Sequence, residues 1–156
     1  MRSRLKAANF LVVRGAEDQY GPTLRTSVRH NSVHLSGSES YALQCLGGCT
    51  PEILVFRDNI VWAKDRVGFI DGTWSEARNI WWSPTRPGLW FDIAGSSFHR
   101  DPRYRDAANG DLRLRSTSPG VDAGGSPPSL PGGARDLRKV AVPQGAAPDI
   151  GAHERP

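Results

Sequence analysis

The sequence has little that would serve as a membrane helix or an export signal. No apolar run approaches the roughly 20 residues that a bilayer-spanning helix needs, and the opening stretch MRSRLKAANFLVV has too short an apolar segment for a signal peptide. No segment sustains a helical period. The Gly-rich phosphate loop and the Gly-x-Ser-x-Gly turn are both missing, so the sequence does not support serine hydrolase chemistry.

The sequence also lacks blocks of like charge. Its 20 basic and 16 acidic residues leave a net charge of +4, and the basic residues are mostly arginines interspersed with aspartates. The densest basic run, between residues 100 and 115, alternates with Asp101, Asp106 and Asp111. Such a run is typical of a solvated, self-neutralising face, so we expect no nucleic-acid partner.

Glycine and proline are abundant. The chain has 17 Gly and 12 Pro in 156 residues, with 38% hydrophobic residues. This hydrophobic content is enough for the core of one domain. The many turn-forming residues favour a turn-rich β protein.

An internal repeat is the most informative pattern. Asn9, Asn31, Asn59 and Asn79 each open a short apolar run, at spacings of 22, 28 and 20 residues. Such spacings are the length of one coil of a solenoid. Each Asn is predicted to occupy a left-handed bend before a strand, and stacked asparagines would hydrogen-bond from coil to coil. Further short strands are expected at 41–46, 53–56 and 67–70.

The aligned columns predict which residues face the core. Two residues after each Asn stand Leu11, Val33, Val61 and Trp81, a wholly apolar column. Four residues after each Asn stand Val13, Leu35, Ala63 and Ser83. Alternation of this kind is typical of strands with one buried face.

The composition changes beyond Arg100. No aromatic residue follows Tyr104, and residues 118 to 151 hold six Pro and seven Gly. This part cannot build a core of its own, so it either drapes over the coils or forms a disordered tail.

The same region carries a family resemblance. DPRYRDAANGDLRLRSTSPGVDAG (101 to 124), then ARDLRK and DIGAHE, resemble the C-terminal signature of bacterial right-handed parallel β-helix proteins, which are related to pectate lyases. The match extends over about 54 residues in the right order. It departs where His153 replaces the usual aromatic residue, and where a longer middle stretch is reduced to ARDLRK.

The resemblance implies an all-β fold, a right-handed parallel β-helix of about four coils over residues 1–99 with an irregular C-terminal capping segment over 100–156. It also implies an extracellular or cell-surface, polysaccharide-related setting. Because the first residues already resemble the middle of a repeat, we expect further coils and any export signal upstream. It does not imply a catalytic residue, because fold-level analogy is only associational evidence about function.

One column suggests a glycan-binding surface. Three residues after each Asn stand Val12, His34, Trp62 and Trp82, on the face opposite the apolar column. His34, Trp62 and Trp82 would form a flat row on which sugar rings can lie. The alternative is that the proline-rich tail covers this row.

A second column contains residue types that act in catalysis. His30, Asp58 and Arg78 directly precede three of the asparagines. In a polysaccharide lyase, His30 would act as the base, next to Asp58, and Arg78 would neutralise the developing charge. The alternative is a salt-bridged ladder.

Cysteines and carboxylates complete the candidates. Two of the three residues between Cys45 and Cys49 are glycines, so the pair can close a small disulfide in an oxidising compartment or remain reduced. We expect no cofactor and no metal site, with calcium at Asp122, Asp149 and Glu154 as an alternative.

Three functions therefore stay open. The first is the C-terminal end of a β-helix protein with a glycan-contact surface. The second is part of a polysaccharide lyase whose cleft lies mainly on upstream coils. The third is an adhesive module that self-associates through the exposed edge of its N-terminal coil.

Overall fold

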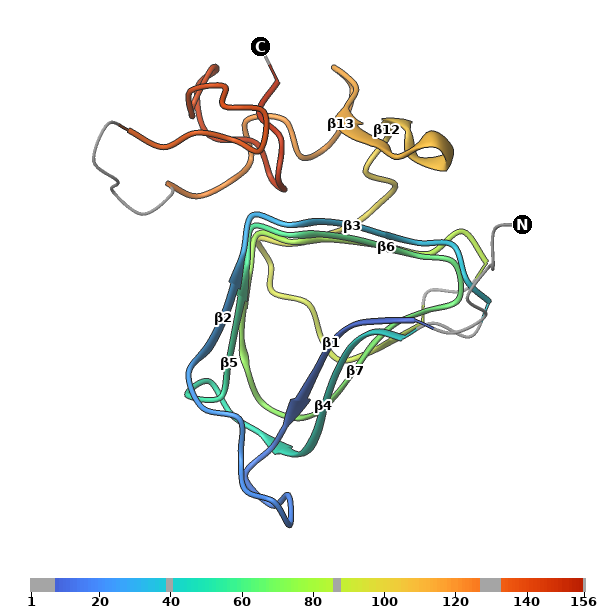
Figure 1. Ribbon diagram of the computed structural model, residues 1–156, viewed down its shortest axis with the longest axis vertical. Helices are drawn as coiled ribbons and strands as arrows, with labels where there is room; N and C mark the ends of the chain where they lie inside the picture. Colours follow the sequence, from blue (N-terminus) through green and yellow to red (C-terminus); the bar gives the residue numbers. More distant parts are fainter. Residues whose placement is uncertain (1–7, 39–40, 86–87, 127–132, 156) are drawn as a thin grey trace.

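The structure is a computed structural model that describes residues 8–38, 41–85, 88–126 and 133–155, and its described part is all-β with parallel sheets (Figure 1). The chain visits three sheets in rotation, and we call one passage through all three a circuit. The first circuit is β1 (Asn9–Arg14), β2 (Thr26–Arg29) and β3 (Ser32–Leu35). The second is β4 (Tyr41–Cys49), β5 (Leu54–Arg57) and β6 (Ile60–Ala63). The third is β7 (Arg66–Gly72), β8 (Ser75–Ala77) and β9 (Ile80–Trp82), and β10 (Gly88–Trp90) and β11 (Phe98–His99) follow.

Strands of the same rank in successive circuits pair in parallel. The first sheet has the order β1-β4-β7-β10, the second β2-β5-β8, and the third β11-β9-β6-β3. Figure 1 shows the three sheets as the sides of a triangle. This arrangement is compatible with the predicted parallel β-helix, and the strands expected at 41–46, 53–56 and 67–70 correspond to β4, β5 and β7.

The core fills the triangle between the three sheets. The third sheet contributes the register column Val33, Val61 and Trp81, of which Val61 and Trp81 are fully buried. Trp81 stacks on Phe56 of the second sheet, with ring centroids 5.2 Å apart. Apolar residues with aromatic or branched side chains form these short strands because they pack well on a pleated, half-buried surface.

An asparagine ladder joins the corners between the second and third sheets. Asn31 Nδ2 donates to Asn59 Oδ1 at 2.9 Å, and Asn59 Nδ2 donates to Asn79 Oδ1 at 3.2 Å. The backbone N–H groups of Asn31 and Asn59 donate to the same two oxygens. Below Asn79, the hydroxyl of Ser97 accepts the next backbone N–H at 2.9 Å.

Two sequence expectations about these asparagines are wrong. The left-handed residue of each corner is the one before the asparagine, namely His30, Asp58 or Arg78, at φ angles of 52°, 60° and 51°. The asparagine side chain is instead engaged in the ladder. Asn9 lies outside the ladder, because it is in β1 of the first sheet and pairs with Tyr41.

Because Asn9 is in the first sheet, the residues that follow it are also outside their predicted columns. Val12 is half exposed on the outer face of the first sheet, so it does not continue the row of His34, Trp62 and Trp82. The physical reason is that β1 and β3 belong to the same circuit, so two similar apolar runs 22 residues apart form different sides of the triangle.

The segment between β10 and β11 covers the end of the core. Phe91 and Ile93 pack against the buried cluster, and Phe91 lies 5.1 Å from Trp81 between ring centroids. Glu76 points inward below Phe56, with which it is in register. Its carboxylate accepts hydrogen bonds from Ala94 N–H at 2.6 Å, the Trp81 indole N–H at 3.1 Å, Asn79 Nδ2 and the Ser97 hydroxyl.

The C-terminal segment lies against the outer face of the third sheet (Figure 1). It contains the antiparallel pair β12 (Tyr104–Asp106) and β13 (Asp111–Leu114), joined by the 3-10 turn η1 (Ala107–Asn109). Ile150 is fully buried with Ile60 and Ile80. The segment therefore drapes over the circuits, as one of the two sequence alternatives proposes, while residues 91–97 cover the end of the core.

We expect Asn59→Ala to lower the free energy of unfolding by about 3 kcal/mol, because it leaves several buried N–H and C=O groups without partners. Asn9→Ala is the matched control, since Asn9 is exposed and should change stability by no more than about 0.5 kcal/mol. Chemical denaturation of both variants checks this. Equal losses in the two variants would contradict the ladder.

Candidate functional site: a groove beside the third sheet

An aromatic row lies on the outer face of the third sheet. His34 of β3, Trp62 of β6 and Trp82 of β9 are in register. They point outward because Val33, Val61 and Trp81, one residue earlier in each strand, point into the core. The His34 and Trp62 rings are 4.2 Å apart between centroids. The structure thus brings together the three residues that the sequence proposes as a sugar-binding row.

The C-terminal segment forms a wall beside this row, and we call the space between them the groove. One hollow of about 470 Å³ is lined by His34 and Trp62, together with wall residues. A second hollow of about 340 Å³ is lined by Trp82 and His99. Both hollows share the wall residues Asp101, Arg103 and Thr117, so they adjoin each other along the row. The tail flanks the row and covers part of it, because His34, Trp62 and Trp82 are all half-buried and Trp62 packs against the cluster that contains Tyr104 and Leu114.

Two arginines are fixed in the wall of the groove. Arg103 NH1 donates to the Thr117 carbonyl at 2.9 Å, and Arg103 N–H donates to Asp101 Oδ1 at 2.8 Å. Arg115 Nε donates to the Tyr104 carbonyl at 3.1 Å. Each guanidinium carries five N–H donors, so these contacts orient the groups and leave donors for a ligand.

His34 is the titratable group of the row. It is half-buried, and burial lowers the pKa of its imidazole below the ordinary value of 6.5. A neutral imidazole has one donor and one acceptor nitrogen. At neutral pH the row therefore offers flat apolar rings with polar edges.

His30 and Arg78 lie on either side of Asp58 in the sequence-predicted column, and both side chains approach the buried Asp58 carboxylate. The carboxylate of Asp58 is 1% exposed and accepts from Arg78 Nε at 2.7 Å and NH2 at 3.2 Å. It also accepts the Gly125 N–H at 2.7 Å, and His30 Nε2 lies 4.0 Å away. Added atoms on Gly125 would collide with the Arg78 guanidinium. This arrangement fastens the C-terminal segment to the corner of the circuits and corresponds to the salt-bridged alternative rather than an open site.

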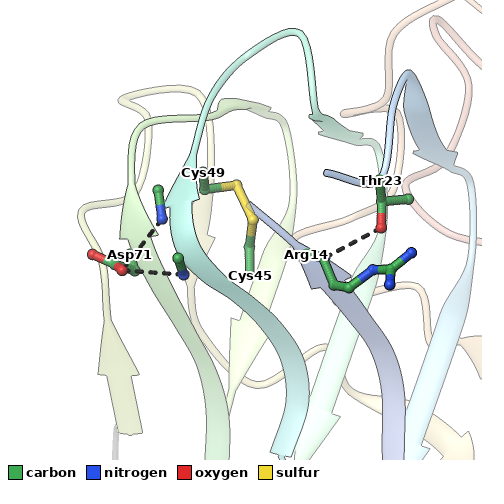
Figure 2. Close-up of a disulfide and its surroundings, with 7 residues drawn as sticks. Arg14, Thr23, Cys45, Cys49 and Asp71 are labelled. Atoms are coloured by element: carbon green, nitrogen blue, oxygen red, sulfur yellow. Dashed lines mark hydrogen bonds between the residues drawn. A yellow bond between two sulfur atoms is a disulfide. The ribbon is translucent and has the colours of Figure 1, made fainter. Parts of the chain in front are cut away.

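Cys45 and Cys49 form a disulfide at the end of β4 (Figure 2). Both cysteines are buried. Between them Gly47 and Gly48 adopt φ angles of 76° and 78°, which glycine reaches without steric cost. Their N–H groups donate to Asp71 Oδ2 at 3.2 and 3.3 Å, so the next circuit holds this bulge in place (Figure 2).

The carboxylates proposed for calcium contact backbone N–H groups. Asp149 accepts from Asp122 N–H at 2.8 Å and Arg155 N–H at 2.9 Å, while Glu154 accepts from Gln144 and Asp149 N–H. Within the described ranges, no group of three or more His, Cys, Asp or Glu side chains is arranged to hold a metal ion. These contacts tie the last residues of the chain together.

Sequence reasoning missed the wall of the groove and the role of Glu76. Asp101, Arg103 and Arg115 belong to the run that we interpreted as a solvated face, and only the fold places them beside Trp62 and Trp82. The residues around Glu76 do not indicate that it points inward, because this orientation follows from its register with Phe56 in the neighbouring strand.

No helix in the described part of the chain has the length and apolar character to span a bilayer. Comparison of the chain with protein-family models, curated proteins and solved structures gives no match.

We expect stability to fall as the pH drops below neutrality. Burial lowers the pKa of His30, His34 and His153 below 6.5, so the unfolded chain takes up these protons at a higher pH than the folded chain does. The free energy of unfolding should therefore decrease as pH falls through 6.5 towards the folded pKa values, and His34→Gln should reduce this slope.

Urea denaturation at a series of pH values measures the slope, and NMR titration of the folded protein measures each imidazole. Stability that rises as pH falls through this window, or imidazoles that titrate above 6.5, would contradict the assignment.

Proposed function

We propose that the chain is part of a secreted or surface-attached right-handed parallel β-helix protein of the pectate-lyase-like superfamily, and that its groove binds a polysaccharide. Rotation through three parallel sheets and the asparagine ladder support the β-helix. The C-terminal signature over 101–154 supports the family. In this proposal, β1, β2 and β3 are the edges at which upstream coils of the same protein pair.

The in-register row of His34, Trp62 and Trp82 carries the functional proposal. Successive strands lie about 4.8 Å apart, so the row runs along the stacking direction. The rings of His34 and Trp62 pack against each other, with centroids 4.2 Å apart, and Trp82 follows them in register. Aromatic faces offer flat apolar area against the C–H groups of a sugar ring, with polar edges beside it. A linear polymer of sugars matches this shape better than a compact ligand does.

The wall of the groove supports the same ligand class. Arg103, Arg115 and Thr117 supply donors and a hydroxyl beside the ring faces. Binding sites for small polar ligands combine apolar surface with a few placed polar groups in this way.

The disulfide supports an extracellular location. Disulfides form and persist in oxidising compartments and are rare in the cytosol. The Cys45–Cys49 pair is buried, and β7 holds its bulge through Asp71. The pair therefore has the environment of a structural disulfide rather than that of an exposed, exchanging one.

The test is a comparison of two tryptophans by fluorescence titration and calorimetry with oligosaccharides of pectate, alginate, glycosaminoglycan and cellulose. We expect Trp82→Ala to weaken binding about tenfold, which corresponds to about 1.4 kcal/mol for loss of a stacking face. Trp90→Ala is the matched control, because Trp90 is 50% exposed and lies on the first sheet, away from the groove.

Retained affinity in Trp82→Ala, or an equal loss in Trp90→Ala, would overturn the assignment of the groove. Absence of binding across all four polymers would also count against it.

A further inference from the structure

A second exposed apolar surface lies on the outer face of the first sheet, away from the groove. Its central column is Val12, Gln44, Phe69 and Trp90, one residue from each strand and in register. Val12 and Trp90 are each 50% exposed and Phe69 is 37% exposed. We call this surface the first-sheet face. Contiguous exposed apolar surface on a soluble protein marks an interaction site.

The central column has a different flank on each side. On one side stands a column of Asn9, Tyr41 and Arg66, three residues earlier in each strand. On the other side, two residues later in each strand, stand Arg14, Leu46 and Asp71. In the third circuit, therefore, a cation lies on one side of Phe69 and an anion on the other.

Arg66, on the cationic flank, is held by contacts with its neighbours. The guanidinium of Arg66 lies 4.7 Å from the centroid of the Tyr41 ring, and NH1 donates to the Tyr41 hydroxyl at 2.9 Å. Arg66 Nε is also 4.0 Å from Asp65 Oδ2. The ring of Tyr41 lies 6.2 Å from that of Trp90 between centroids. Tyrosine, tryptophan and arginine fixed in this way are the residues that dominate the energetics of protein interfaces.

The anionic side is ordered as well. One oxygen of Asp71 accepts the N–H groups of Gly47 and Gly48, as Figure 2 shows. These two contacts fix the carboxylate and leave its other oxygen available to a partner. Figure 1 shows the C-terminal segment on the opposite side of the triangle, over β3 and β6.

We propose that the first-sheet face is an interface between two copies of this chain. The two copies are related by a twofold axis that runs parallel to the central column. Each circuit of one copy then faces the same circuit of the other, and the flank before the column in one copy faces the flank after the column in the other. Phe69 then meets Phe69 of the second copy, Tyr41 meets Leu46, and Arg66 meets Asp71. Strand geometry puts the Arg66 and Asp71 positions roughly 10 and 7 Å from the axis, a difference that a long arginine side chain can span.

Self-complementarity favours a second copy over other occupants. An interface with twofold symmetry must present groups that complement one another across the axis. The exchange of flanks pairs a cation with an anion and an aromatic ring with an aliphatic side chain.

The size of the face predicts a weak dimer. Four strands about 4.8 Å apart and about six residues long give a face of order 400 Å² on each copy. The two faces together bury about 800 Å², which is below the roughly 1,200 Å² of a standard specific interface and in the range of weak, transient contacts. The association should therefore depend on concentration, with a dissociation constant in the micromolar range.

Sedimentation velocity from the micromolar to the submillimolar range tests the association. We expect a reversible monomer–dimer equilibrium, and we expect Phe69→Glu to raise the dissociation constant at least about tenfold by placing two like charges at the axis. Tyr20→Glu is the matched control, because Tyr20 is 76% exposed at a corner outside the face, and it should leave the equilibrium unchanged.

A charge exchange tests the flanks. Arg66→Asp and Asp71→Arg should each weaken the dimer, and the double variant should restore it because the opposite charges again face each other. Thermal unfolding of each variant accompanies the measurement, since Asp71 also holds Gly47 and Gly48. A double variant that stays as weak as the single variants would overturn the pairing.

Cysteine crosslinking tests the axis without disturbing the apolar contact. Gln44→Cys should be crosslinked to the second copy by a short bis-maleimide reagent, since Gln44 lies on the axis and facing sheets are about 10 Å apart. Ser27→Cys, on the edge strand β2, should not. Crosslinking through Ser27 instead would indicate association through the open strand edges and would overturn the proposal.

Two further outcomes count against the proposal. The first is a protein that stays monomeric throughout the concentration range. The second is oligosaccharide binding that is lost in Phe69→Glu while the parent protein is monomeric, which would make the face a glycan site.

Discussion

The asparagine ladder is the interaction on which the stacking of the circuits depends. The amide oxygens of Asn59 and Asn79 each accept both a side-chain and a backbone N–H from the circuit before, and both residues are fully buried. A buried amide that lacks a partner is costly, so the ladder is stable only when neighbouring circuits are in register. That register aligns the outer residues into rows, which include the floor of the groove.

The ladder also explains how the stack ends. Below Asn79, a serine replaces the next asparagine, and the carboxylate of Glu76 accepts from Asn79, Trp81 and Ser97. This partly buried carboxyl group is stable there because backbone and side-chain donors surround it. The segment that supplies Ser97 also brings Phe91 over the open end of the core. One segment therefore provides the last hydrogen-bond partner of the ladder and covers the apolar core.

Sequence patterns predicted β1, β3 to β7, β9 and the outward row, since these depend on alternation within a few residues, and they missed β2 and β8. They could not assign a strand to a side of the triangle, because that depends on the length of each corner. Asn9 opens an apolar run much like that of Asn31, yet the first is an exposed residue of β1 and the second is in the ladder. The wall of the groove was missed for a related reason, since Arg103 and Trp62 meet only when the C-terminal segment folds back.

Amide hydrogen exchange of the ladder residues tests the central claim most directly. The N–H groups of Asn31, Asn59 and Asn79 donate to side-chain oxygens of the following circuit, so their exchange reports the stacking itself. The account predicts that the amides of Asn59 and Asn79 exchange as slowly as that of buried Val61. Exchange of these two amides at the rate of an exposed loop would contradict it.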